Sequence, residues 1–233
     1  FHLTISNFVN RMLAKLFHLL SAFFKGKIAI DYVAVGLQRE RIFKIPLVTN
    51  YIRISNFELI VQEIKENKLS GSVAEVGVYK GEFAKYINVA FPDRKFYLFD
   101  TFEGFNEIDV KIENSNNLST GSQDFSNTSV DEVLKRMPHQ HNCIIKKGYF
   151  PESLDGLEDV FCFVSLDPDL YKPILDGLEY FYPRLVEGGY IFIHDYNNVL
   201  YPGAKKAVRE FCHKHRIPFV PITDSWGTVV ITK

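Results

Sequence analysis

The sequence contains few cysteines, and their spacing fits neither a metal site nor a disulfide framework. Its 233 residues include three, Cys143, Cys162 and Cys212, with no C-x-x-C pair. Cys143 and Cys162 fall in short apolar runs that we expect to be strands, so they should be reduced residues of the core. Reduced thiols are typical of the cytosol, and we expect a cytoplasmic protein.

An excess of charge of one sign is also lacking. The 27 Lys and Arg residues are balanced by 28 Asp and Glu residues. The chain therefore has no global field that would attract a polyanion. We expect no nucleic-acid partner.

No stretch is a convincing membrane span or export signal. The apolar stretch from Phe8 to Phe24 is short and is interrupted by Arg11 and Lys15. The sequence starts at Phe1 and shows no small-residue cleavage site of a secretory signal. We expect no stable membrane insertion and no export.

The beginning of the chain predicts an amphipathic helix. Apolar residues recur at helical spacing from Ile5 to Phe24, with Arg11 and Lys15 on the opposite side. This stripe would pack against its own domain or a second subunit, or lie on a membrane surface. We expect a homo-oligomer, with a dimer as the default.

Repeats and Pro-, Gly- or Ser-rich linkers are absent, which predicts one domain over residues 51–233 after a helical extension over 1–50. Short apolar runs alternate with helical segments, the pattern of βαβ units. We expect an α/β fold with a doubly wound, mostly parallel, seven-stranded Rossmann-like sheet. The expected strands are Ser72–Val78, Lys95–Phe99, Cys143–Lys147, Val160–Leu166, Tyr190–His194, Phe219–Ile222 and Thr228–Thr232. One helix is expected to start near Ser55. Further helices are expected over Glu82–Ala90, Val130–Arg136, Tyr171–Phe181 and Gly203–His215.

One polar segment does not fit the alternation of strands and helices. Glu107–Asn127 is rich in Asn and Ser, has no periodicity, and is long for a connection in a compact domain. We expect a mobile lid or binding loop.

The first expected strand leads into a candidate cofactor loop, Glu75–Gly81. An acidic residue, Glu75, is followed by Gly77, Tyr79 and Gly81, where glycines let the backbone turn and approach a ligand. The spacing departs from G-x-G-x-x-G, so an ordinary turn is the alternative.

The second expected strand ends at Asp100, which is followed by Thr101. In Rossmann-like units a carboxylate at this place accepts hydrogen bonds from ribose hydroxyls, although Asp100 could also cap a turn. A dehydrogenase would use the same strand ends but prefers three glycines around a pyrophosphate. The missing glycine favours S-adenosylmethionine, and a nicotinamide-dependent oxidoreductase is the alternative.

Acidic residues follow the fourth and fifth expected strands, at Asp167, Asp169 and Asp195. Asp167 and Asp195 should meet at the sheet edge, where paired carboxylates hold a divalent cation, create a base, or do both. His194 would suit a softer ion such as manganese or zinc, or act as the base. The structural alternative is that Asp169 caps the Tyr171 helix, Asp195 caps a turn, and His194 is a satisfied core residue.

Five segments in order resemble the macrocin O-methyltransferase family, which includes mycinamicin and novobiocin sugar methyltransferases. They are Glu75–Gly81, Phe99–Phe105, Lys147–Leu154, Leu166–Tyr171 and Asp195–Tyr196, and Pro202–Val208 and Gly227–Val229 resemble the end of these proteins. The resemblance runs from about Tyr51 to the end of the chain. It implies a class I, S-adenosylmethionine-dependent methyltransferase sheet with an antiparallel last strand, and methylation of a sugar hydroxyl on a glycan, nucleotide sugar or glycosylated natural product.

The resemblance also implies roles for particular residues. Asp167 would be the base and a magnesium ligand, and Asp195 the second residue of a metal-binding aspartate pair whose first position is His194 here. A catalytically silent cofactor-binding scaffold is the alternative suggested by this change. Phe102, Glu103, Gly148 and Tyr149 would line the adenosine pocket, and Phe125 and Asn127–Ser129 would close over it.

Overall fold

The computed structural model describes residues 12, 15–16, 41–43 and 50–233. The chain divides into two compact units, Phe1–Arg41 and Ile42–Lys233. The amphipathic helix expected over Ile5–Phe24 lies outside the described residues except at Met12, Lys15 and Leu16, which are helical. Among the helices that are described, none has the length and apolar character needed to cross a bilayer.

The second unit is built on a seven-stranded sheet with the order β3-β2-β1-β4-β5-β7-β6. The strands are β1 Ser72–Val76, β2 Phe96–Asp100, β3 Cys143–Lys147, β4 Phe161–Leu166, β5 Leu185–Ile193, β6 Val220–Ile222 and β7 Thr228–Thr232. β1 to β5 pair in parallel, and β7 runs antiparallel to both β5 and β6. The predicted doubly wound sheet, with its antiparallel last strand, is confirmed. β5 begins earlier than predicted because Leu185 pairs with Phe161 before an irregularity in the register.

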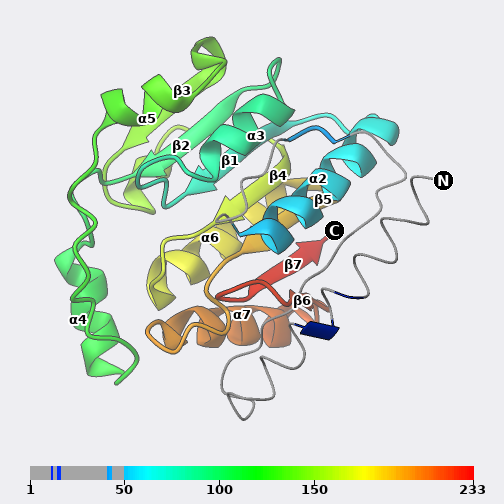
Figure 1. The fold of residues 1–233 in the computed structure, drawn as a ribbon. Helices are drawn as coiled ribbons and strands as arrows, with labels where there is room; N and C mark the ends of the chain where they lie inside the picture. The colour runs from blue at the N-terminus through cyan, green and yellow to red at the C-terminus, as the bar shows by residue number, and fades with distance from the viewer. Residues whose placement is uncertain (1–11, 13–14, 17–40, 44–49) are drawn as a thin grey trace. The chain divides into compact units, whose positions relative to one another are not determined.

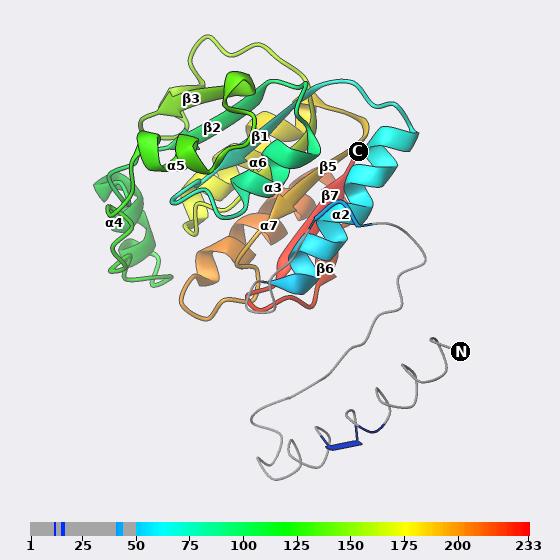
Figure 2. The same ribbon diagram turned by 45° about the horizontal axis from the view of Figure 1, so that its top comes forward.

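Helices cover both faces of this sheet, as Figures 1 and 2 show. The helices are α2 Tyr51–Glu66, α3 Ala84–Ala90, α4 Glu107–Ser115, α5 Val130–Arg136, α6 Tyr171–Arg184 and α7 Pro202–His215. In β2, Phe96 and Leu98 point to the α2 and α3 side, whereas Tyr97 and Phe99 point to the α6 and α7 side. The two-residue period of a strand thus supplies both apolar cores.

The expectation of a loop over Glu107–Asn127 is wrong for its first part, which forms α4. Both views show α4 outside the two layers that cover the sheet. The buried positions of α4 are Asp109 and Glu113, so a helical period exists but consists of carboxylates. Apolar periodicity was therefore absent from a real helix. Its start is capped by the side chain of Asn106, which accepts the N–H of Ile108 at 2.8 Å.

Candidate active site

The site lies where β1 and β4 are neighbours, the point at which the strand order reverses. Gly77 follows β1 with φ of +81°, and a Cβ atom there would lie 2.2 Å from the carbonyl oxygen of Asp167. Only glycine allows the two loops to touch in this way. The crevice at such a reversal is the usual ligand site of open α/β sheets.

Asp100, at the end of β2, organises the loops around it. Its Oδ2 accepts the N–H of Tyr79 at 2.7 Å, and its Oδ1 accepts the N–H of Phe102 at 2.7 Å. The Asp100 side chain therefore caps a local turn, the alternative to ribose binding that was predicted from the sequence. Each oxygen keeps a second lone pair, so the same side chain is still able to accept a ribose hydroxyl.

Glu75 lies within β1 and is 2% exposed. Its Oε2 has no hydrogen-bond partner among the described residues. Burial raises the pKa of this carboxyl well above its usual range, although nearby Arg53 opposes the shift. A buried polar atom without a partner normally indicates a missing ligand or solvent contact, and Glu75 faces the cavity described next.

A cavity of about 430 Å³ opens at this edge of the sheet. Seven of the nine predicted cofactor residues line it: Glu75, Gly77, Tyr79, Asp100, Thr101, Gly148 and Tyr149. The structure does not bring the other two into the lining. Gly81 lies against Met137 and Val133, and Phe102 is a core residue with 5% exposure. Both shape the loops behind the pocket. Glu103, also expected there, is exposed and pairs with Lys147 at 2.9 Å.

The segment after α4 covers the Tyr79 side of the cavity. The Tyr79 hydroxyl donates to Oδ1 of Asn127 at 2.7 Å, and the ring of Phe125 packs edge-on against Tyr79 with centroids 5.1 Å apart. Thr128 Oγ1 donates to the carbonyl of Tyr79, and Ser129 caps α5. The predicted covering segment is therefore in place against the cofactor loop.

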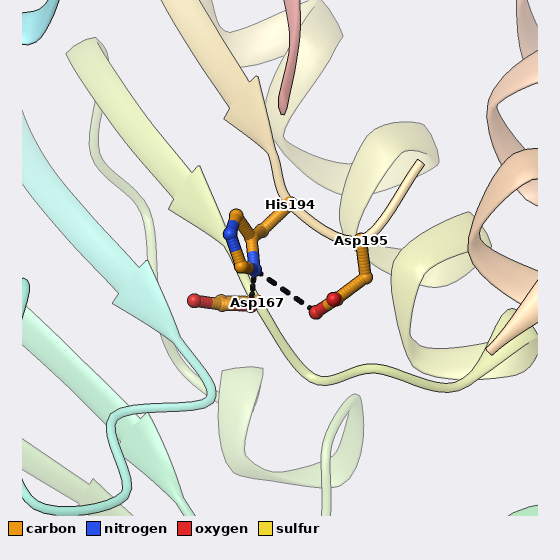
Figure 3. A group of neighbouring side chains, drawn as sticks. All are labelled: Asp167, His194 and Asp195. Carbon is orange, nitrogen blue, oxygen red and sulfur yellow. Dashed lines mark hydrogen bonds and ion pairs between the residues drawn. The ribbon is translucent and has the colours of Figure 1, made fainter. Parts of the chain in front are cut away.

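Asp167, His194 and Asp195 form one cluster beside this cavity (Figure 3). Nδ1 of His194 lies 3.0 Å from Oδ1 of Asp167 and 3.0 Å from Oδ2 of Asp195. Asn198 donates to the other Asp195 oxygen at 2.7 Å. The imidazole Nε2 is buried without a partner among the described residues, so His194 is satisfied at Nδ1 alone.

The charges in this cluster stabilise one another. Burial and Arg53 would lower the pKa of His194, but the carboxylates of Asp167 and Asp195 raise it to about 9. Burial would raise the pKa of Asp167, yet His194 and Arg53 lower it overall. Asp167 is thus held as a carboxylate, with one fifth of its side chain exposed toward the cavity.

Asp169 lies in the cavity wall rather than at the start of α6. The N-cap position of α6 is Leu170, with no side-chain cap. The N–H of Tyr171 instead donates to Oε1 of Glu113, from α4, at 2.7 Å. The capping interpretation of Asp169 is therefore wrong. Burial and the charges of Asp167 and Asp195 raise the pKa of Asp169 well above its usual range.

Sequence reasoning missed Arg53, in the first turn of α2. Its Nη1 donates to Oδ2 of Asp167 at 2.9 Å and its Nη2 to Oγ of Ser165 at 3.3 Å. The guanidinium lies 4.1 Å from the centroid of the Phe83 ring, and the residue is 6% exposed. Arg53, Phe57 and Val61 are spaced four residues apart, so Arg53 lies on the apolar face of α2. A charged residue on an otherwise apolar helix face is the sequence signal that could have identified it.

Two kinds of ligand fit these residues. The cavity volume, the close approach allowed by Gly77 and the unpartnered Glu75 oxygen suit a nucleoside-containing cofactor. In the cluster, ligand atoms of Asp167, His194 and Asp195 all lie within 4.8 Å of one another. The two 3.0 Å separations equal those between adjacent ligands of an ion with bonds of about 2.1 Å at right angles.

The comparisons with known proteins agree with this geometry. The family described as macrocin-O-methyltransferase (TylF) matches residues 46–230. The chain is 26% identical over 188 residues to mycinamicin III 3''-O-methyltransferase of Micromonospora griseorubida, covering 71% of this chain and 69% of that protein. It is 24% identical over 186 residues to demethyldecarbamoylnovobiocin O-methyltransferase of Streptomyces niveus, covering 71% and 67%.

Among solved structures, the O-methyltransferase NovP has the same fold, with a TM-score of 0.63, 22% identity and coverage of 78% of this chain and 79% of that chain. The family match decides for a methyltransferase over the oxidoreductase that would use the same sheet edge. The chain belongs to the macrocin O-methyltransferase (TylF) family and is an S-adenosylmethionine-dependent O-methyltransferase.

Proposed function

We propose that the enzyme transfers the methyl group of S-adenosylmethionine to a hydroxyl of a sugar unit in a small-molecule or glycan acceptor. The observation that carries the proposal is the cluster of Asp167, His194 and Asp195 in the wall of the cofactor cavity. One relative, from Streptomyces olivaceus, is named as a 4'-O-methyltransferase of a rhamnosyl-tetracenomycin; it is 25% identical over 210 residues, covering 76% of this chain and 71% of that protein. A sugar hydroxyl is protonated at neutral pH, so its methylation needs a group that removes the proton.

In the proposed reaction the acceptor oxygen attacks the sulfonium methyl carbon. The C–O bond forms as the C–S bond breaks, and the electron pair of the C–S bond stays on sulfur. Asp167 takes the hydroxyl proton through the oxygen that is not held by Arg53. Glu75, Gly77 and Asp100 position the cofactor, and the covering segment at Phe125 excludes water.

We also propose a divalent cation, magnesium or manganese, at Asp167, His194 and Asp195. When bound, it would lower the pKa of the acceptor hydroxyl. His194 would be its nitrogen ligand through Nδ1, the atom nearest both carboxylates. Nε2 is the atom through which His194 would act if it were a base, because it has no other partner among the described residues.

The test is transfer of labelled methyl to a panel of glycosides, nucleotide sugars and glycans, with chelator and after restoring Mg²⁺ or Mn²⁺. We expect turnover on at least one sugar, its loss with chelator and its recovery with metal. Asp167→Asn should bind S-adenosylmethionine normally by calorimetry but lose at least about a hundredfold in kcat. Cofactor binding without turnover on any acceptor would instead identify a catalytically silent scaffold.

We further propose a cytoplasmic homodimer without a nucleic-acid partner. The amphipathic stretch from Ile5 to Phe24 supports the dimer, and the balanced charge supports the lack of a nucleic-acid partner. The three free thiols support the cytoplasm, and burial raises the pKa of each to about 11. Light scattering of the full chain should give twice the monomer mass. A monomer at micromolar concentration would contradict the dimer.

A further inference from the structure

An exposed apolar pair stands at the rim of the catalytic cavity. Trp226 is 50% exposed and Leu200 is 53% exposed, and both line the same cavity as Asp167 and His194. Trp226 is the one tryptophan of the sequence. Apolar and aromatic side chains that line a polar pocket provide contact area for the apolar part of a ligand.

The backbone that carries Trp226 is fixed, so the exposure does not come from a loose loop. The N–H of Asn197 donates to the carbonyl of Trp226 at 2.9 Å, and that of Tyr196 donates to the carbonyl of Gly227 at 2.8 Å. Asp224 accepts both the N–H and the hydroxyl of Thr228 at 2.5 Å. The turn between β6 and β7 is thereby attached to the segment that follows Asp195.

Leu200 is connected to the catalytic cluster by a short chain of hydrogen bonds. Its N–H donates to Oδ1 of Asn198 at 3.0 Å, and Nδ2 of Asn198 donates to Oδ1 of Asp195 at 2.7 Å. The rim therefore has a defined position relative to the reacting centre. An acceptor whose hydroxyl reaches Asp167 occupies a cavity that these two side chains also line.

The charges of the cavity argue against an anionic acceptor. Seven acidic side chains line it, although burial raises the pKa of three of them, Glu75, Asp109 and Asp169. Among the described lining residues, Arg53 and Lys80 carry the fixed positive charges. Arg53 is engaged with Asp167, and Lys80 lies 5.0 Å from the Tyr79 ring centroid on the cofactor loop. Neither is available to a diphosphate at the Trp226 rim.

We propose that Trp226 and Leu200 form an aglycone subsite, which binds the apolar aglycone of an uncharged glycoside while its sugar lies inside by Asp167. This rests on the proposed methylation of a sugar hydroxyl. Trp226 and Leu200 would then determine acceptor specificity. The aglycone subsite would favour glycosides with an apolar aglycone over nucleoside diphosphate sugars.

The single tryptophan gives a direct binding measurement that does not depend on turnover. The full chain with S-adenosylhomocysteine would be titrated with hexyl rhamnoside, methyl rhamnoside, hexanol and a thymidine diphosphate sugar while Trp226 emission is recorded. We expect a blue shift with hexyl rhamnoside, at least about tenfold tighter binding than with methyl rhamnoside, and no shift with the nucleotide sugar. Equal responses to the two rhamnosides, or a tighter response to the nucleotide sugar, would overturn the aglycone assignment.

Variants separate the subsite from the reaction itself. Trp226→Ala should raise KM for the hexyl glycoside about tenfold or more and leave the Kd for S-adenosylmethionine unchanged, whereas Trp226→Phe should recover part of the loss. Val199→Ala is the control, because Val199 adjoins Leu200 and is 87% exposed but does not line the cavity. If the enzyme methylates the glycoside and Trp226→Ala leaves KM unchanged, the aglycone subsite is refuted and the proposed function stands. Absence of methylation by the wild-type chain refutes the proposed function, and the emission titration still decides the subsite.

Discussion

Nη1 of Arg53 lies 2.9 Å from Oδ2 of Asp167, although 114 positions separate the two residues in sequence. One oxygen of the proposed base is thereby fixed, and the other faces His194. The guanidinium also reaches Ser165 in β4, so the contact ties α2 to the strand that carries Asp167. A planar group with several donors holds a carboxylate in one orientation, which a flexible ammonium does less well.

Arg53→Lys should therefore lower kcat by about ten- to a hundredfold while changing the Kd for S-adenosylmethionine little. The charge remains, but the simultaneous contacts with Asp167 and Ser165 are lost. Steady-state kinetics and calorimetry measure the two quantities. Arg94→Lys is the control: Arg94 also lies against a phenylalanine ring, but it donates to the carbonyls of Leu69 and Gly71 away from the cavity. It should reduce thermal stability and spare kcat; equal kcat losses would mean that Arg53 is only structural.

The strands were predictable because each is a short apolar run. β1 is followed by Gly77, which has a positive φ, and β2 ends at Asp100, whose carboxylate accepts two backbone N–H groups. These local signals also placed Asp167 and Asp195 together, since parallel strands end at one edge. Arg53 and α4 were not predictable in the same way. Apolar periodicity fails at both places. Arg53 is a charge on the apolar face of α2, and the buried positions of α4 are the carboxylates Asp109 and Glu113. Their partners come from distant segments, which no local pattern encodes.

Gly77→Ala should disrupt the cofactor site. A Cβ atom would overlap the Asp167 carbonyl, and the φ of +81° adds backbone strain. We expect about 3 kcal/mol less stability and at least about tenfold weaker S-adenosylmethionine binding. Gly156→Ala has a similar φ of +68° but no neighbour within 4 Å of the added carbon. It should cost about 1 kcal/mol and leave cofactor affinity intact. Similar losses of cofactor affinity in the two variants would show that contact with Asp167 is not the cause.

Asp109, on the buried face of α4, should make stability depend on pH. Burial raises its pKa to about 6 from 3.8, against the opposing bond from Tyr149 and the charge of Lys172. Its folded pKa exceeds the unfolded value, so its contribution is fully present below about pH 4 and is lost as pH rises through about 6. Asp109→Asn keeps an acceptor for Tyr149 and cannot ionise. At pH 7 it should exceed the wild type by about 1–2 kcal/mol in free energy of unfolding, with little difference at pH 4.

Urea unfolding at both pH values measures this difference. Glu107→Gln, on the exposed face of the same helix, is the matched control. If the difference between Asp109→Asn and the wild type were the same at pH 4 and pH 7, burial would not be raising the pKa of Asp109.

His194→Asp tests the proposed choice of metal ion. A nitrogen ligand favours manganese over magnesium, and an aspartate would complete a set of three carboxylates with Asp167 and Asp195. The preference for Mn²⁺ over Mg²⁺, measured as the ratio of their calorimetric dissociation constants, should fall by about tenfold or more. His213→Asp, exposed on α7, introduces the same charge away from the cluster and should leave the ratio unchanged. An unchanged ratio in His194→Asp would remove His194 from the metal site and leave Nε2 as its functional atom, because that nitrogen is buried without a partner among the described residues.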